Sequence, residues 1–243
     1  MKIQNPYFPF GIPGTKEPIL FCFHHAGGNA GQLRQWAGVK DDVAIVPVEY
    51  AGHGCRMDEE FPESIQEIAN ELAKAIFVNY QNRDVYVYGH SLGTLIAFET
   101  VKVLERLGVR VNRLIVAGRG APFDAELIDF KSHMGVEALI EEMRRVGGME
   151  EELLQDKRFM EFFSPIILHD YWLHERYEYD GSHIAAPISA HCANGDADTN
   201  LEQMSQWQQV TSGSFDKRGF EGGHFFVLES EEYLSILISE VKG

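Results

Sequence analysis

The sequence of 243 residues contains little cysteine and no long apolar segment. Its three cysteines, Cys22, Cys55 and Cys192, form no Cys-x-x-Cys motif and cannot all pair, which argues against a disulfide scaffold and favours a reducing compartment. No stretch approaches the ~18 apolar residues of a membrane span. Residues 1–14 lack the apolar core that a signal peptide requires. We therefore expect a cytoplasmic protein that does not enter a membrane.

Basic residues are also scarce in this sequence. Only 21 lysines and arginines stand against 37 acidic side chains, so the formal net charge at pH 7 is −16. A field of this sign disfavours binding to nucleic acid or to an anionic membrane. Hydrophobic residues make up 44% and charged residues 24%, close to globular averages and sufficient for a core. Because repeats and low-complexity linkers are absent, we expect one monomeric domain over residues 1–243.

Short apolar segments alternate with amphipathic ones along the chain. The apolar segments read as buried strands, and they are Ile19–Phe23, Val43–Val48, Asp84–Tyr88, Leu114–Ala117, Ile188–Ala193 and, more weakly, Ser214–Arg218. Between them the apolar spacing becomes helical, in a helix that follows a capping box at Ser64, in one from Leu92 to about Leu107, and in a last one from Glu231. This alternation predicts an α/β fold with a mostly parallel central sheet flanked by helices.

One segment, from about residue 124 to residue 180, contains no convincing strand. Its residues follow a helical pattern rich in Met, Phe and Leu, with one amphipathic helix expected over Met134–Val146 and another over Leu153–Phe163. The segment lies between two predicted strands, so we expect a helical lid inserted over the C-terminal edge of the sheet, where open α/β sheets bind ligands. Some of its apolar residues are expected to form core and others to face a ligand.

A pentapeptide, Gly89-His90-Ser91-Leu92-Gly93, carries the first chemical signal. A Gly-x-Ser-x-Gly match arises by chance in roughly one chain in ten of this length, so its context decides. Here the motif directly follows one predicted strand and directly precedes a predicted helix, as a nucleophile elbow requires. The glycines avoid a clash in the tight turn, and the helix N-terminus faces the developing negative charge. The sequence therefore predicts a serine hydrolase of the α/β-hydrolase type with Ser91 as its nucleophile.

A serine nucleophile needs a base and an acid, which in this fold follow it in the order serine, acid, histidine. The predicted strand Ile188–Ala193 leads into the loop Asn194-Gly195-Asp196-Ala197-Asp198, and beyond that loop the sequence has one histidine, His224. We therefore predict His224 as the base. The pattern alone leaves the acid open between Asp196 and Asp198, since either carboxylate could orient the imidazole.

An oxyanion hole requires two backbone N–H groups near the nucleophile. Leu92, directly after the serine, supplies one. The glycine-containing loop after the first strand supplies the other, from Ala26 or Gly27. The neighbouring His24 and His25 suggest a metal site, but no third ligand follows at a suitable spacing, so we expect neither a metal nor a cofactor.

Together these motifs resemble the type II thioesterases, the stand-alone editing enzymes of nonribosomal peptide and polyketide synthesis. The resemblance runs from Phe21 to the C-terminus in the same order and at similar spacing. The segments that carry it are His24–Gly28, Ala51–Arg56, Gly89–Gly93, the trio of Pro165, Asp170 and Tyr177, the pair of Gly195 and Asp198, and Gly222–Phe226. His24 and Ala51 depart from the family, which usually has proline there, but neither change removes a group that the mechanism needs.

The resemblance implies hydrolysis of acyl thioesters on the 4′-phosphopantetheine arm of acyl- or peptidyl-carrier proteins, which frees misprimed or stalled carriers. It assigns the acid to Asp198 and the oxyanion donors to Ala26 and Leu92. In the implied mechanism His224 deprotonates Ser91, which attacks the thioester carbonyl. The thiol then leaves and water resolves the acyl-enzyme.

Three other functions are compatible with the same sequence. A medium-chain fatty acyl thioesterase that terminates chains would differ chiefly in the shape of its lid. A small-molecule carboxylesterase would prefer plain esters to carrier thioesters. A non-enzymatic binding protein that kept the fold would not be labelled at Ser91 by a fluorophosphonate.

Overall fold

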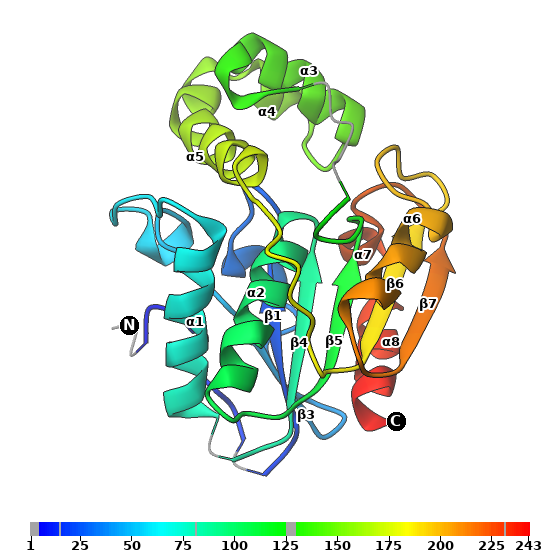
Figure 1. Cartoon of the computed structure of the whole chain (residues 1–243). Coiled ribbons are helices and arrows are strands. Elements are labelled where there is room, and N and C mark those ends of the chain that lie inside the picture. The colour runs from blue at the N-terminus through cyan, green and yellow to red at the C-terminus, as the bar shows by residue number, and fades with distance from the viewer. Residues whose placement is uncertain (1–4, 15, 81, 125–129, 231) are drawn as a thin grey trace.

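A computed structural model describes residues 5–14, 16–80, 82–124, 130–230 and 232–243. Seven strands form one sheet in the order β2-β3-β1-β4-β5-β6-β7 (Figure 1). Their bounds are β1 Ile19–Phe23, β2 Gly38–Lys40, β3 Val43–Pro47, β4 Val85–His90, β5 Val111–Ala117, β6 Ile188–Ala193 and β7 Phe215–Phe220. Every neighbouring pair is parallel except β2 with β3. The predicted mostly parallel α/β sheet is confirmed.

Most residues of the inner strands are buried, which explains their apolar sequences. All residues of β1, β3 and β6 are buried, because helices cover both faces of the sheet. The edge strand β2 was not predicted. It has only three residues, Gly-Val-Lys, and a glycine and a lysine on a short sheet edge carry almost no strand signal.

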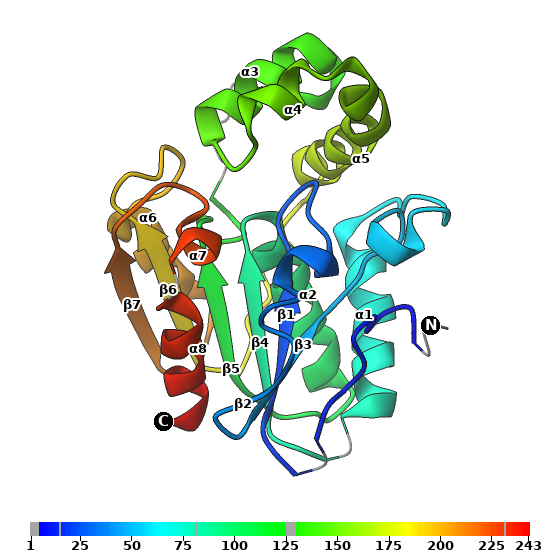
Figure 2. The ribbon, with the colours of Figure 1, turned by 180° about the vertical axis from the view of Figure 1, so that it is seen from behind.

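Helices cover the two faces of the sheet in different numbers. In Figure 1, α1 (Ile65–Asn79) and α2 (Leu92–Arg106) lie side by side on one face, and Figure 2 shows α8 (Tyr233–Lys242) on the other. The Ser64 hydroxyl caps α1 by accepting the Glu67 N–H at 3.1 Å, as the capping box predicts. The predicted first residue of the last helix, Glu231, lies outside the described residues.

Two short helices, α6 (Leu201–Ser205) and α7 (Phe226–Glu229), complete the core fold and were not predicted. They span five and four residues, too few for an amphipathic period to stand out. Within the described part of the chain, no helix combines the length and apolarity needed to cross a bilayer.

Three helices stand over the carboxyl edge of the sheet (Figure 1). They are α3 (Val136–Val146), α4 (Glu151–Gln155) and α5 (Lys157–Glu175), and we call them the helical insertion. They share an apolar cluster of their own, formed by Phe130, Leu139, Met143, Leu154, Met160 and Ile167. Within the predicted lid segment 124–180, residues 125–129 lie outside the described residues.

The second predicted helix of this insertion is broken into α4 and α5 at Asp156. The Asp156 carboxylate accepts the N–H groups of Arg158 and Phe159 at 2.9 and 3.2 Å, which caps a new helix. Helix α5 then runs through Pro165 to Glu175, farther than predicted. Its C-terminal half lies over the carboxyl ends of the parallel strands, where their loops converge.

Candidate active site

Ser91 lies between β4 and α2 in a backbone conformation that serine rarely adopts. Its φ of 54° and ψ of −124° are strained for any residue with a side chain. A Cβ added to Gly89 would lie 2.4 Å from the carbonyl oxygen of Gly93, and one added to Gly93 would lie 2.5 Å from that of His24. Both motif glycines are therefore required by close backbone contacts. The turn is the sharp strand–helix turn of a nucleophile elbow.

His224 lies in the loop after β7, and its Nδ1 is 3.0 Å from Oδ2 of Asp196, which follows β6. This contact places the proton on Nδ1 and leaves Nε2 as the basic nitrogen. The Asp196 carboxylate is fully buried and also accepts the N–H of Asp198 and the hydroxyl of Thr199, both at 2.9 Å. Burial raises the pKa of Asp196, but the hydrogen bond and charge of His224 and these other bonds outweigh it and lower the pKa overall. Asp196 is therefore ionised at neutral pH.

Asp198 does not occupy the place that the resemblance assigned to it. Its carboxylate pairs instead with the guanidinium of Arg145 on α3, at 2.7 Å from Nη1 and 3.2 Å from Nη2. The bond from the Asp198 N–H to Asp196 closes a tight turn that leaves Asp196 on His224 and Asp198 on Arg145. The carboxylate on the histidine is thus that of Asp196, the alternative that the loop pattern left open.

The same three residues could in principle attract a cation. Ligand atoms of Asp196, Asp198 and His224 lie within 4.8 Å of one another. However, Asp196 already accepts three hydrogen bonds, and Arg145 neutralises the oxygens of Asp198. This arrangement suits proton transfer better than metal coordination.

A small cavity of about 40 Å³ joins the nucleophile to the loop after β1, and Ala26, Ser91, Leu92 and His224 all line it. Among the described residues, the N–H groups of Ala26 and Leu92 donate to no protein acceptor. The N–H of Gly27, by contrast, donates to Oδ2 of Asp170 at 2.7 Å. Of the two loop amides that the sequence left open, Ala26 is therefore the one available to a substrate oxygen.

The side chains of Ser91 and His224 border this cavity, but no hydrogen bond joins them within the described structure. Contacts between nucleophile and base are often long in unliganded hydrolases and shorten when substrate binds. The loop geometry around them is already set, because the His90 ring donates from Nε2 to the His224 carbonyl at 2.9 Å.

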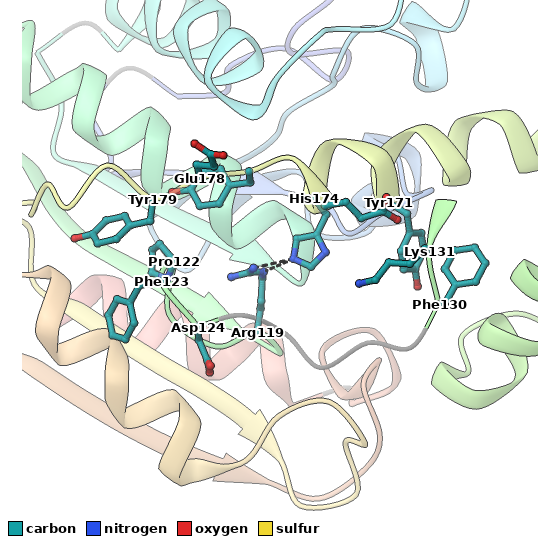
Figure 3. A pocket seen from close by; sticks show the side chains of 12 residues that line it. Arg119, Pro122, Phe123, Asp124, Phe130, Lys131, Tyr171, His174, Glu178 and Tyr179 are labelled. Atoms are coloured by element: carbon teal, nitrogen blue, oxygen red, sulfur yellow. Dashed lines mark hydrogen bonds between the residues drawn. The ribbon is translucent and has the colours of Figure 1, made fainter. Parts of the chain in front are cut away.

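A larger cavity of about 490 Å³ adjoins the small one and shares Arg119, Tyr171 and His174 with it (Figure 3). Arg119 donates from Nε and Nη2 to Nε2 of His174, at 3.2 and 2.7 Å. Burial and the positive charge of Arg119 lower the pKa of His174 to about 3, so the imidazole is neutral and can accept these bonds. The cavity wall therefore carries a fixed guanidinium close to the nucleophile.

A second aspartate–histidine pair adjoins the loop after β1 that contains Ala26 and Gly27, which we call the oxyanion loop. Oδ2 of Asp170 on α5 is 3.0 Å from Nε2 of His53, and Nδ1 of His53 is 3.1 Å from the carbonyl oxygen of Ala51. Both side chains are 1% exposed. Because each ring nitrogen faces an acceptor, both carry hydrogens and His53 is an imidazolium. Burial lowers the pKa of His53, but the charge and hydrogen bond of Asp170 outweigh it and raise the pKa above the usual range.

Asp170 was predicted only through the resemblance, and Arg119 and His174 had no predicted role. A signal for Asp170 was present, since it follows Ile166 and Ile167 and lies on the apolar side of a helix. A carboxylate at such a position is rarely buried without a partner. His24, by contrast, was considered above only as a metal ligand and as a departure from the family. It is buried and stacks on Tyr50 with ring centroids 3.8 Å apart, so its role is to pack the loop.

The elbow at Ser91, the ordered Asp196–His224 pair and the two unused amides define a serine hydrolase of the α/β-hydrolase type. The family model described as "Thioesterase domain" matches residues 18–242. The chain therefore belongs to the thioesterase family and is a thioester hydrolase.

Individual relatives agree with this assignment. The chain is 34% identical over 212 residues to "Thioesterase PikA5" of Streptomyces venezuelae, covering 86% of this chain and 75% of that one. The thioesterase RedJ from the prodiginine pathway of Streptomyces coelicolor is 29% identical, with a TM-score of 0.83 over 96% of this chain and 88% of that one. BorB, the type II thioesterase of the borrelidin cluster, is 28% identical, with a TM-score of 0.83 over 96% of each chain. The resemblance to type II thioesterases is confirmed.

Proposed function

We propose that this protein is a type II thioesterase that hydrolyses acyl thioesters on the 4′-phosphopantetheine arm of acyl- or peptidyl-carrier proteins and so regenerates free carriers. The single observation that carries the proposal is the Asp196–His224 contact of 3.0 Å beside Ser91, in a chain whose relatives include a type II thioesterase. The three cysteines are free thiols, which fits an enzyme that acts in the cytoplasm.

The first half of the reaction transfers the acyl group to Ser91. Nε2 of His224 takes the hydroxyl proton while Oγ attacks the thioester carbonyl carbon, and Asp196 stabilises the resulting imidazolium. The carbonyl oxygen becomes an oxyanion that the N–H groups of Ala26 and Leu92 stabilise. When the tetrahedral intermediate collapses, the carbon–sulfur bond breaks and the pantetheine sulfur takes the proton from His224. The products are the free carrier thiol and an acyl ester of Ser91.

The second half hydrolyses this ester. His224 removes a proton from a water molecule, whose oxygen attacks the ester carbonyl with the same two amides on the oxyanion. Collapse breaks the bond to Ser91, whose oxygen takes the proton back from His224. The carboxylic acid leaves and the enzyme returns to its starting protonation state.

The helical insertion acts in this proposal as a lid over the acyl group. The cavity of about 490 Å³ beneath it is lined by the aromatic rings of Phe123 and Phe130 but also by Arg119, Lys131 and Glu175. A long alkyl chain would displace water from these charged groups without offering them hydrogen bonds, whereas a short or polar acyl group would not. This lining favours editing of short acyl groups over release of medium-chain fatty acids.

Steady-state kinetics on three matched substrates tests the proposal. They are an acetyl-loaded carrier protein, a dodecanoyl-loaded carrier protein and p-nitrophenyl acetate, with the Ser91→Ala variant as the blank. We expect kcat/KM to be highest for the acetyl carrier. A higher value for p-nitrophenyl acetate would identify a carboxylesterase, and a higher value for the dodecanoyl carrier would identify a chain-terminating thioesterase.

A further inference from the structure

Helix α5 meets the active site through two side chains one turn apart. Asp170 and His174 are four residues apart and so share one face of the helix. Asp170 binds the loop after β1 through Gly27, and His174 binds Arg119, which follows β5. One helix of the insertion therefore holds the loops on two sides of Ser91.

The contact of α5 with the oxyanion loop is close at Gly27. This residue has a φ of +70°, and a Cβ added to it would lie 2.6 Å from Cγ1 of Ile167. Only glycine fits both the conformation and the space. The loop is held on its other side as well, where the Tyr50 hydroxyl donates to the His24 carbonyl at 3.1 Å. The bond from the Gly27 N–H to Asp170 is thus the polar part of a tight packing contact.

The charge of Asp170 is balanced inside the protein by His53. An unpaired carboxylate beside the place where an oxyanion forms would oppose that oxyanion. The imidazolium of His53, at 3.0 Å, cancels this charge. Burial raises the pKa of Asp170, but the charge and hydrogen bond of His53 and the Gly27 N–H outweigh it and keep the pKa below its usual range.

Only one oxygen of this carboxylate makes hydrogen bonds within the described structure. Oδ2 accepts from both Gly27 and His53, while Oδ1 is buried without a partner among the described residues. Any movement of Asp170 away from these two donors would leave a buried charge unsatisfied. Gly27, His53 and Asp170 are therefore expected to move together or not at all.

We propose that Asp170 is a positioning residue of the oxyanion hole. By binding the Gly27 N–H it fixes the orientation of the neighbouring peptide groups and leaves the Ala26 N–H for the thioester oxygen. Since Asp170 belongs to α5, the oxyanion hole is complete only when the helical insertion lies in its place over the sheet. This inference rests on the proposed function, because it assigns a part in the same reaction.

Two variants of Asp170 and one of the same helix test this role. Asp170→Ala removes both acceptor oxygens, whereas Asp170→Asn keeps the shape and one acceptor. Asp156→Ala, the control, removes the cap at the other end of α5, far from the oxyanion loop. Each variant is assayed with the acetyl thioester of N-acetylcysteamine and titrated with benzeneboronic acid, which adds to a nucleophilic serine as a tetrahedral anion.

If Asp170 is a positioning residue, its variants should stabilise the charged transition state less well but bind the substrate about as well as the wild type. Asp170→Ala should lower kcat by about 10- to 100-fold with KM changed less than about threefold, and should weaken boronate binding by a similar factor. Asp170→Asn should lose less in both measurements, and Asp156→Ala should stay within about twofold of the wild type. A purely structural role would lower the amount of folded protein without changing boronate affinity per folded molecule.

Several results would overturn the inference. One is a folded Asp170→Ala protein with kcat within about twofold of the wild type, and another is a fall in kcat with unchanged boronate affinity. If circular dichroism shows that Asp170→Ala does not fold, Asp170→Asn decides, and boronate affinity equal to that of the wild type refutes the role. If the wild-type protein binds boronate but hydrolyses no thioester, the proposed function fails, and boronate affinity of the variants still tests Asp170.

Discussion

Two aspartate–histidine pairs lie near the oxyanion loop, and they differ in the surroundings of the second ring nitrogen of each histidine. The Asp196–His224 and Asp170–His53 contacts are both 3.0 Å long. His53 is 1% exposed and bonds through both nitrogens, whereas His224, among the residues that the structure describes, bonds through Nδ1 alone and borders the cavity at Ser91. A histidine with one available nitrogen can accept and return a proton, but one with both nitrogens donating cannot.

The two pairs also connect different parts of the chain. Asp196 and His224 both follow strands of the sheet, so the core fold alone assembles them. Asp170 and His53 join the helical insertion to the sheet. The first pair is suited to proton transfer. The second pair is suited to holding the helical insertion in its position on the oxyanion loop.

Loss of the nucleophile, Ser91, or of the base, His224, should have the largest effect on activity. Ser91→Ala and His224→Ala should each lower kcat by about 10⁴- to 10⁶-fold, because each removes a group that no neighbour replaces. The measurement is hydrolysis of an acetyl-loaded carrier, with circular dichroism to verify folding. A folded His224→Ala enzyme with more than a hundredth of wild-type kcat would exclude His224 as the base.

The next largest effect on kcat is expected from the aspartate that acts as the acid, Asp196 rather than Asp198. Asp196→Asn should lower kcat by about 10³- to 10⁴-fold, since the imidazole loses its orientation and its counter-charge. Asp198→Asn is the matched control two residues away, and it should cost less than about tenfold because it disturbs mainly the ion pair with Arg145. If the two losses are reversed, Asp198 is the acid, as the resemblance implied.

A glycine substitution tests the packing of the insertion on the oxyanion loop. Gly27→Ala should lower kcat by about 10- to 100-fold, because the added methyl group would displace Ile167 and with it α5. Gly135→Ala is the control, since Gly135 has a similar φ of +87° but no atom within 4 Å of an added Cβ. Equal losses in the two variants would mean that backbone strain, not contact with α5, causes the effect.

The smallest expected effect is on the stability of the fold at acid pH. It comes from histidines that are buried in their neutral form. Burial and neighbouring positive charge lower the pKa of His90 and of His174 from 6.5 to about 3. The unfolded chain then binds protons that the folded chain excludes, so stability is complete above pH 6.5 and is lost as the pH falls towards 3. Each histidine should contribute up to about 1.4 kcal/mol of unfolding free energy per pH unit.

Urea denaturation at several pH values measures this slope. His174→Gln keeps an acceptor for Arg119 but cannot be protonated, so the slope between about pH 4 and 6 should decrease by up to that amount. An unchanged slope would mean that His174 is already charged in the folded protein.

Features that depend on local sequence were predictable, and features that depend on distant partners were not. All strands but β2, the elbow at Ser91 and the position of His224 follow from periodicity, glycine spacing and chain order. The resemblance assigned the acid to Asp198, but the structure places Asp198 on Arg145, 53 residues distant, on an insertion whose packing the sequence does not specify. The pairing of Asp170 with His53 spans 117 residues, so no local pattern could reveal it.

Mass spectrometry after rapid acid quenching can detect the covalent step at Ser91. The protein is mixed with an acetyl-loaded carrier and quenched during turnover, and the peptide that contains Ser91 is weighed, with Ser91→Ala as the control. Because a thiol is a good leaving group, the acyl-enzyme should accumulate before water resolves it. We expect an acetyl group on Ser91 in the wild type and none in the variant. Thioester hydrolysis in a protein whose Ser91 never carries the acyl group would contradict this expectation.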